Sequence, residues 1–236
     1  MTTPCVRGSS LKDAMHPPGE PSDTKVANST TIGIFAVTIL AVSAKALSGG
    51  GAISAEGFVD PATGIAFSPS EGKLGLMGVG VRVKKLGPVA VKVYSVGFYT
   101  DTSAVSKAVN AKAGTESFYG EIAGARAEKA LHLKFARGVG TDKVADALAS
   151  VAGVPAKALT QFGTLLRDAI GVDGVRTGET ITLRWPAGGA SLLVDVRGKR
   201  AGVVKDASLP AGVFTMFLGS ASVSPALRKN IAARYS

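Results

Sequence analysis

The sequence predicts an α+β fold in which a large antiparallel sheet packs against a layer of helices. Several segments alternate apolar and polar residues with a period of two, which is typical of strands. These segments come in groups, interrupted by a pair of helical segments and followed by two more. A doubly wound parallel sheet needs a helix after each strand, so this order favours antiparallel pairing with helices on one face.

Two long strands dominate the first half of this prediction. Residues 73–85 and 89–100 both read as strands, and Gly87-Pro88 between them marks a tight turn. A short hairpin at 58–67, turning around Pro61 and Gly64, precedes them. Shorter strands are expected at residues 117–122, 129–137, 180–185, 190–196 and 198–204.

Capping residues and prolines mark the expected helix starts. Thr102 or Ser103 opens one helix, and Pro155 opens another. Pro225 lies in the first turn of the last helix, where Ser222 or Ser224 is the expected cap. The helices are expected at residues 103–113, 141–151, 155–170, 210–218 and 224–235.

Composition limits the classes of function. The 236 residues carry a formal net charge of +10, but the basic residues are scattered and aromatic residues do not alternate with them. This pattern disfavours a nucleic-acid partner. Cys5 is the single cysteine, and His16 and His132 lie far apart in the sequence. We therefore expect no disulfide, no metal site and no cofactor.

The N-terminal region differs from the rest of the chain. Residues 1–25 are rich in Pro, Ser and Thr and are expected to be a disordered tail. Residues 26–44 carry no charge, and a helix of that length spans about 28 Å, so 26–47 is predicted to cross a membrane. A signal-peptide core and an organelle presequence are the alternatives. A Gly-rich linker at 48–55 leads into a domain at 56–236.

An organelle membrane is the expected location of such an anchored chain, either the plastid thylakoid or the mitochondrial inner membrane. The charges on the two sides of residues 26–47 are too similar to determine the orientation.

Arg82 and Tyr94 are the candidate binding residues. They lie on the two long predicted strands, with their side chains expected to face the same interior. A cation in apolar surroundings needs a partner, and a bound carboxylate would supply one. The alternative is a structural salt bridge from Arg82, for example to Asp101 or Glu121.

Two motifs carry a family resemblance. Leu76-Met-Gly-Val-Gly-Val-Arg82, followed by Val91-Lys-Val-Tyr-Ser-Val-Gly-Phe-Tyr-Thr-Asp101, resembles the chalcone isomerase superfamily. Phe217-Leu-Gly-Ser-Ala-Ser-Val-Ser-Pro-Ala-Leu-Arg228 resembles its C-terminal motif. The similarity covers about residues 56–236 and implies an open-faced β-sandwich with a helical layer.

The resemblance also implies a function. Members that cyclise a chalcone use an Arg and a Thr on the motif strands, with a Tyr and an Asn near the following helix pair. Arg82 matches the Arg, whereas Tyr94, Gly140 and Ala147 fall at the other three positions. Thr215 or Met216 falls at a last polar position. This pattern resembles the non-catalytic branch, in which the Arg and the Tyr hold the carboxylate of a fatty acid.

The resulting hypothesis is a membrane-anchored, non-enzymatic protein that binds a fatty acid or a similar amphiphile, with membrane lipid as a further partner. An accessory subunit of a membrane protein complex is the first alternative. An active isomerase is the second, and it would need hydrogen-bond donors that Gly140 and Ala147 lack. Nine apolar residues are expected to line an acyl tunnel: Val79, Val81, Val91, Val93, Leu131, Leu133, Phe135, Phe214 and Phe217.

Overall fold

Seven antiparallel strands form the framework of residues 57–236, the part of the chain that the computed structural model describes. Neighbours in the sheet follow the order of the sequence, from β3 at one edge to β9 at the other. The strands are β3 (Ser70–Glu71), β4 (Leu74–Leu86), β5 (Val89–Thr100), β6 (Lys129–Phe135), β7 (Thr180–Trp185), β8 (Leu192–Val196) and β9 (Lys199–Val204). A separate hairpin pairs β1 (Phe58–Val59) with β2 (Ala66–Phe67).

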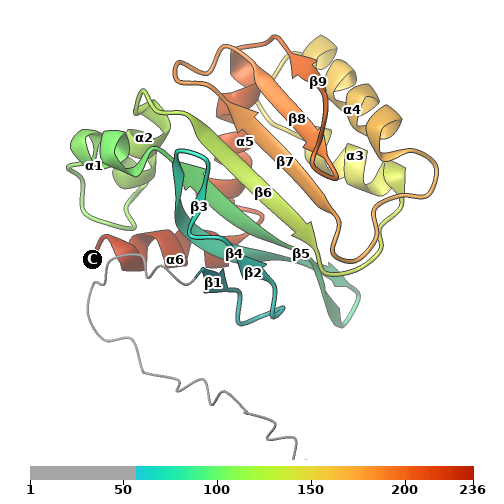
Figure 1. Ribbon diagram of the computed structural model, residues 1–236, viewed down its shortest axis with the longest axis horizontal. Helices are drawn as coiled ribbons and strands as arrows, with labels where there is room; N and C mark the ends of the chain where they lie inside the picture. The colour runs from blue at the N-terminus through green and yellow to red at the C-terminus, as the bar shows by residue number, and fades with distance from the viewer. Residues whose placement is uncertain (1–56) are drawn as a thin grey trace, which may run out of the picture. The chain divides into compact units, whose positions relative to one another are not determined.

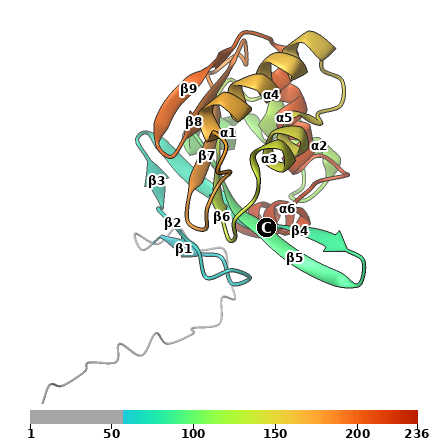
Figure 2. The same cartoon turned by 90° about the vertical axis from the view of Figure 1, so that its right-hand side faces the viewer.

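The helices lie on one side of the sheet, and the β1–β2 hairpin lies on the other (Figures 1 and 2). They are α1 (Thr102–Ala108), α2 (Glu116–Gly124), α3 (Thr141–Ala149), α4 (Ala156–Ile170), α5 (Ser208–Leu218) and α6 (Pro225–Arg234). The main hydrophobic core fills the space between these helices and the sheet. The predicted α+β fold with a large antiparallel sheet is therefore confirmed.

A smaller core lies on the opposite face of the sheet. Phe67 of β2 packs there against Leu76, Val79 and Tyr99 of β4 and β5. The hairpin is held in place by Ser95, whose hydroxyl donates to the carboxylate of Asp60 at the hairpin turn. The predicted hairpin at 58–67 is confirmed, and it covers only part of this face.

β4 and β5 form a long hairpin with a two-residue turn. Leu86 pairs with Val89, and Gly87 between them has a φ of 59°. This left-handed conformation is the one that tight hairpin turns require and that glycine adopts without strain. The hairpin end extends past the helices (Figure 2).

α6 lies directly against β4, and the glycines of the first motif make this possible. An added Cβ at Gly80 would lie 2.2 Å from the backbone nitrogen of Leu227. The helix also bonds the strand backbone: Asn230 Oδ1 accepts from the amide of Val79 at 2.9 Å, and the Ser224 hydroxyl donates to the Val81 carbonyl at 3.0 Å. The two sequence motifs therefore meet in the fold.

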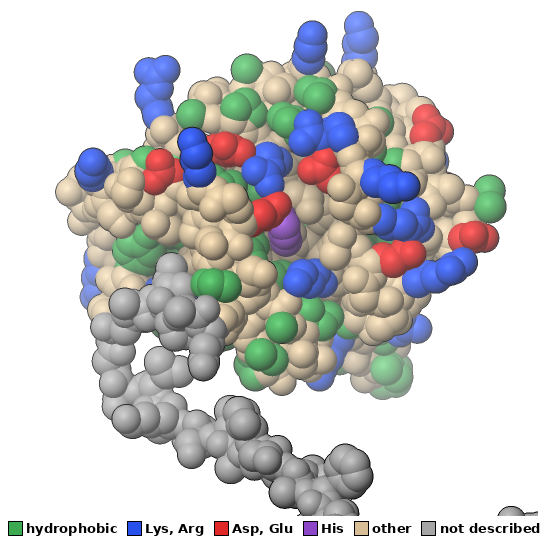
Figure 3. Space-filling view, in the orientation of Figure 1, with side chains coloured by type: hydrophobic (Ala, Val, Ile, Leu, Met, Phe, Trp, Pro, Cys, Tyr) green, Lys and Arg blue, Asp and Glu red, His purple; other side chains and the backbone are tan. Residues whose placement is uncertain are grey.

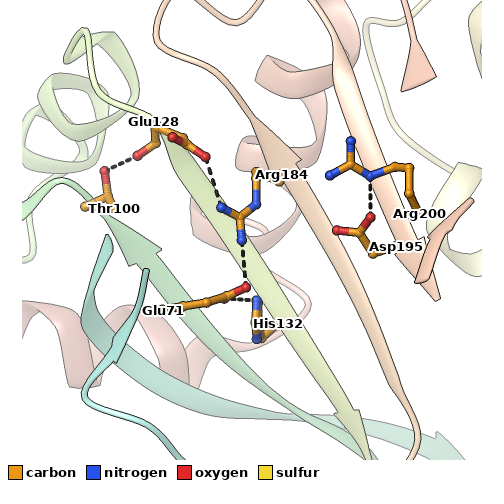
Figure 4. Close-up of polar contacts among 7 residues, drawn as sticks. All are labelled: Glu71, Thr100, Glu128, His132, Arg184, Asp195 and Arg200. Atoms are coloured by element: carbon orange, nitrogen blue, oxygen red, sulfur yellow. Dashed lines mark hydrogen bonds and ion pairs between the residues drawn. The ribbon is translucent and has the colours of Figure 1, made fainter. Parts of the chain in front are cut away.

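Charged side chains of both signs lie interspersed on the face of the sheet opposite the helices (Figure 3). Arg184 bridges Glu128 and Glu71, and His132 is paired with Glu71 (Figure 4). Burial raises the pKa of Glu71, but hydrogen bonds and charges from His132 and Arg184 outweigh it and lower that pKa overall. This network links Glu71 of β3 across the face of the sheet to β6 and β7, so His132 has a structural contact here.

The predicted strand at 117–122 is wrong, because this segment is helix α2. The Thr115 hydroxyl accepts from the amide of Phe118 at 3.2 Å and caps the helix. Phe118 and Ile122 are both buried and lie four residues apart, which is a helical spacing. A short apolar segment fits a period of two as well, but a period of 3.6 fits these buried positions better.

The helix predicted at 103–113 ends earlier than expected, at Ala108, and its cap is Asp101 rather than Thr102 or Ser103. Glu121 of α2 accepts from the amides of Asn110 and Ala111 at 2.6 and 2.8 Å, which holds this stretch in a different conformation. The sequence analysis also missed β3, which has two residues.

The predictions for residues 1–55 lie outside the described residues. They include the tail at 1–25, the membrane segment at 26–47 and the linker at 48–55. Within residues 57–236, none of the helices has the length and apolar character needed to cross a membrane.

Candidate functional site

A cavity of about 310 Å³ lies between the β4–β5 hairpin and α3. Buried Tyr94, Phe135, Val144 and Leu148 contribute its apolar walls. Other lining residues are more exposed and mark the side that faces solvent: Lys84, Leu86, Arg137, Gly138, Gly140 and Lys143. This volume is at the small end of the range for sites that bind small molecules.

A β-bulge directs Tyr94 into this cavity. Arg82 pairs with Tyr94 and the next residue, Val83, pairs with Lys92, so Val93 has no partner in the ladder. Regular alternation would send Val93 and Tyr94 to opposite faces of the sheet. The bulge instead lets both side chains line the cavity, together with Arg82 on the facing strand.

The Tyr94 ring is held by aromatic neighbours. Its centroid lies 5.4 Å from that of Phe135, in an edge-to-face arrangement, and 6.4 Å from that of Phe217. Burial raises the pKa of Tyr94 to about 12, although the positive charge of Arg82 acts in the opposite direction. Tyr94 is therefore a neutral hydrogen-bond donor throughout the physiological pH range.

Arg82 lies beside Tyr94, with its guanidinium carbon 6.0 Å from the ring centroid. Within residues 57–236, the buried Nη1 atom of Arg82 and the buried hydroxyl of Tyr94 both lack a hydrogen-bond partner. The alternative of a salt bridge to Asp101 or Glu121 is wrong. Asp101 caps α1, and Glu121 binds the backbone amides of residues 110 and 111.

Positive charge surrounds the cavity. Besides Arg82, its lining includes Lys84 of β4, Arg137 of the loop after β6 and Lys143 of α3, and none of its lining residues within 57–236 is acidic. The sequence analysis did not assign these three residues to the site. The strand pattern could have identified Lys84 as a site residue, because it lies two residues after Arg82 on the same strand. Arg137 and Lys143 are brought to the site by tertiary packing alone.

Three of the nine residues expected to line an acyl tunnel line this cavity. Val91, Val93 and Phe135 line the cavity. Val79 packs instead in the smaller core on the other face, and four more predicted residues belong to the main core: Leu131, Leu133, Phe214 and Phe217. Val81 is half-buried and does not line the cavity.

The positions that the resemblance assigned to catalysis fall into two groups. Gly140 and Ala147 do line the Arg82 cavity and bring no side-chain donor to it. Thr215 lines a second cavity of about 270 Å³ elsewhere, and Met216 lines neither. Lys129 borders that second cavity, but its ammonium group donates to the carbonyls of Ala125 and Ala127 and so has a structural role.

The antiparallel sheet and its helical layer define the class of protein as an open-faced α+β domain. Its pocket is basic and partly apolar. The model of the chalcone isomerase-like family matches residues 65–231. The chain therefore belongs to the chalcone isomerase-like family.

Among solved structures, the chain is similar to a fatty-acid binding protein of Arabidopsis thaliana, AtFAP1. The two share 26% sequence identity with a TM-score of 0.66, and the match covers 75% of this chain and 96% of the other. The comparison with curated proteins returned no match.

Proposed function

We propose that this protein binds a fatty acid or a similar anionic amphiphile in the Arg82 cavity and does not act as an enzyme. The observation that carries the proposal is the pair of buried polar atoms on Arg82 and Tyr94 that have no partner within residues 57–236. A carboxylate accepts hydrogen bonds from both a guanidinium and a hydroxyl, so it would satisfy them together. The similarity to a fatty-acid binding protein supports the same ligand class.

The rest of the cavity is consistent with this ligand. Val91, Val93, Val144 and Leu148 offer apolar contacts for an alkyl chain. Cyclisation of a chalcone would instead need further donors aimed at the developing enolate and the reacting oxygen. The lack of side-chain donors at Gly140 and Ala147 therefore argues against isomerase activity.

Calorimetric titration of the purified chain with two amphiphiles of equal length tests this proposal. Laurate carries a carboxylate and dodecyltrimethylammonium a positive head, so the basic cavity should bind laurate with a stoichiometry of one and reject the cation. Equal affinity for both, or no binding of laurate, would refute the proposal. Turnover of naringenin chalcone well above the spontaneous rate would refute its non-enzymatic part.

We also propose that residues 26–47 tether the protein to an organelle membrane. This rests on the uncharged segment at 26–44. We expect the full chain to resist alkaline carbonate extraction and to lose this resistance when residues 26–47 are deleted. Release of the full chain would contradict the proposal.

The alternative of an accessory subunit predicted a collapsed pocket with a paired Arg82, and the open cavity favours ligand binding instead.

A further inference from the structure

The end of the β4–β5 hairpin exposes apolar side chains to solvent. We define the hairpin tip as residues 83–92. It contains three of the six large apolar side chains that are exposed within residues 57–236: Val83 at 44%, Leu86 at 54% and Val89 at 58%. Isolated exposed apolar residues need no explanation, but their concentration on a projecting hairpin (Figure 2) is typical of an interaction surface.

The charges of the hairpin tip are all positive. Lys84 and Lys85 are flanked by Val83 and Leu86, Lys92 follows Val91, and residues 73–100 contain no Asp or Glu. Lys84 and Lys85 are exposed and belong to no ion pair within the described part of the chain. Lysine heads beside exposed Val and Leu match the anionic surface of a bilayer, where apolar side chains enter the acyl region and ammonium groups reach the phosphates.

The hairpin tip and the cavity share residues. Lys84, Leu86 and Val91 of the tip also line the cavity, and Arg137 and Lys143 add further positive charge on the same side. A surface that contacts a bilayer at this point would therefore place the entrance of the cavity against the lipid.

We propose that the hairpin tip docks on anionic membranes by inserting Leu86 and Val89, which pair next to the turn, among the lipids, with Lys84 and Lys85 at the phosphates. The occupant of this surface is an anionic phospholipid bilayer. Docking here is independent of the segment at 26–47. Docking of the tip would allow an acyl chain to pass directly between the bilayer and the cavity. Only this passage rests on the proposed function.

A fluorescent label on the tip tests the docking. In the full chain carrying Cys5→Ser, a cysteine is introduced by Val89→Cys or, as a control on the far edge of the sheet, by Val203→Cys, and is labelled with an NBD dye. Vesicles of phosphatidylcholine with and without phosphatidylglycerol are then added. We expect a blue shift and a gain of emission at position 89 with the anionic vesicles only, and none at position 203.

Three further variants, one of them a control, keep the test specific. Val83→Asp should abolish the shift at position 89, because a carboxylate next to Lys84 adds a negative charge that anionic lipid repels, while laurate binding in solution persists because Val83 does not line the cavity. Lys84→Gln with Lys85→Gln should remove the preference for anionic vesicles, whereas Lys199→Gln with Lys205→Gln should not. An unchanged spectrum at position 89, or equal changes at 89 and 203, would overturn the proposal. A failure of laurate binding with the shift intact would refute only the proposed function.

Discussion

Arg82 and Tyr94 lie opposite each other on β4 and β5, and each has a buried polar atom without a partner in the described part of the chain. The guanidinium carbon of Arg82 lies 6.0 Å from the Tyr94 ring centroid. Buried polar groups are nearly always hydrogen-bonded, and leaving one without a partner costs stability. Two such groups side by side in one cavity are best explained as a preformed site for an anion.

Removal of the guanidinium should weaken binding. Arg82→Ala should lower the affinity for laurate about 10- to 100-fold, because a hydrogen bond to a charged group contributes roughly 1.5–3 kcal/mol. Isothermal titration calorimetry measures this, with Lys199→Ala on β9 as a control that removes the same charge far from the cavity. Equal affinities for the two variants would contradict the assignment of Arg82.

Removal of the Tyr94 hydroxyl should weaken binding without destabilising the free protein. Tyr94→Phe deletes a buried hydroxyl that has no hydrogen-bond partner within residues 57–236, so the free energy of unfolding at pH 7 should stay unchanged or rise by about 1 kcal/mol. Urea denaturation measures the stability and calorimetry the affinity. A loss of stability at pH 7 would show that the hydroxyl has a structural partner.

Alkaline pH should lower the stability of the natural protein more than it lowers the stability of the Tyr94→Phe variant. An unfolded tyrosine releases its proton near pH 10, whereas Tyr94 in the folded state has a pKa of about 12. Between these values the folded state binds more protons, so stability falls as pH rises. The difference should reach about 2–3 kcal/mol at pH 12. Denaturation curves of both proteins from pH 9 to 12 check it, and parallel curves would contradict it.

Filling the cavity should exclude the ligand. Ala147 lines the cavity from α3 and is half-buried, so Ala147→Phe should reduce laurate affinity about 10-fold or more by occupying the space for the alkyl chain. Ala156→Phe, at an exposed position of α4, is the matched control. The expected difference between the two variants in titration calorimetry would vanish if the ligand bound elsewhere.

The contact between β4 and α6 should tolerate no side chain at Gly80. Gly80→Ala places a Cβ 2.2 Å from the backbone nitrogen of Leu227 and should destabilise the fold by about 3 kcal/mol. Gly120→Ala in α2 meets nothing within 4 Å and should be neutral or stabilising by up to about 1 kcal/mol. Thermal unfolding of both variants checks the contrast, and similar melting temperatures would refute it.

The period-two pattern, the turn at Gly87-Pro88 and the grouping of strands were sufficient to predict the antiparallel sheet and its long hairpin. These features are local, so they can be recognised in the sequence. The segment at 117–122 was mispredicted because a short apolar run fits both periods, and its helix depends on the Thr115 cap. β3 has only two residues, so it carries no periodic signal.

The sequence by itself was enough to identify Arg82 and Tyr94 as candidates, because the strand motifs that carry them resemble those of the chalcone isomerase superfamily. Their meeting in one cavity was decided by the tertiary structure: the unpaired Val93 bulges β5, changes the direction of Tyr94 and sets it beside Arg82. The positive charges of Arg137, in the loop after β6, and Lys143, on α3, reach the same cavity only in the tertiary structure. Side-chain direction at a bulge and proximity between distant segments follow from long-range contacts, which local patterns do not record.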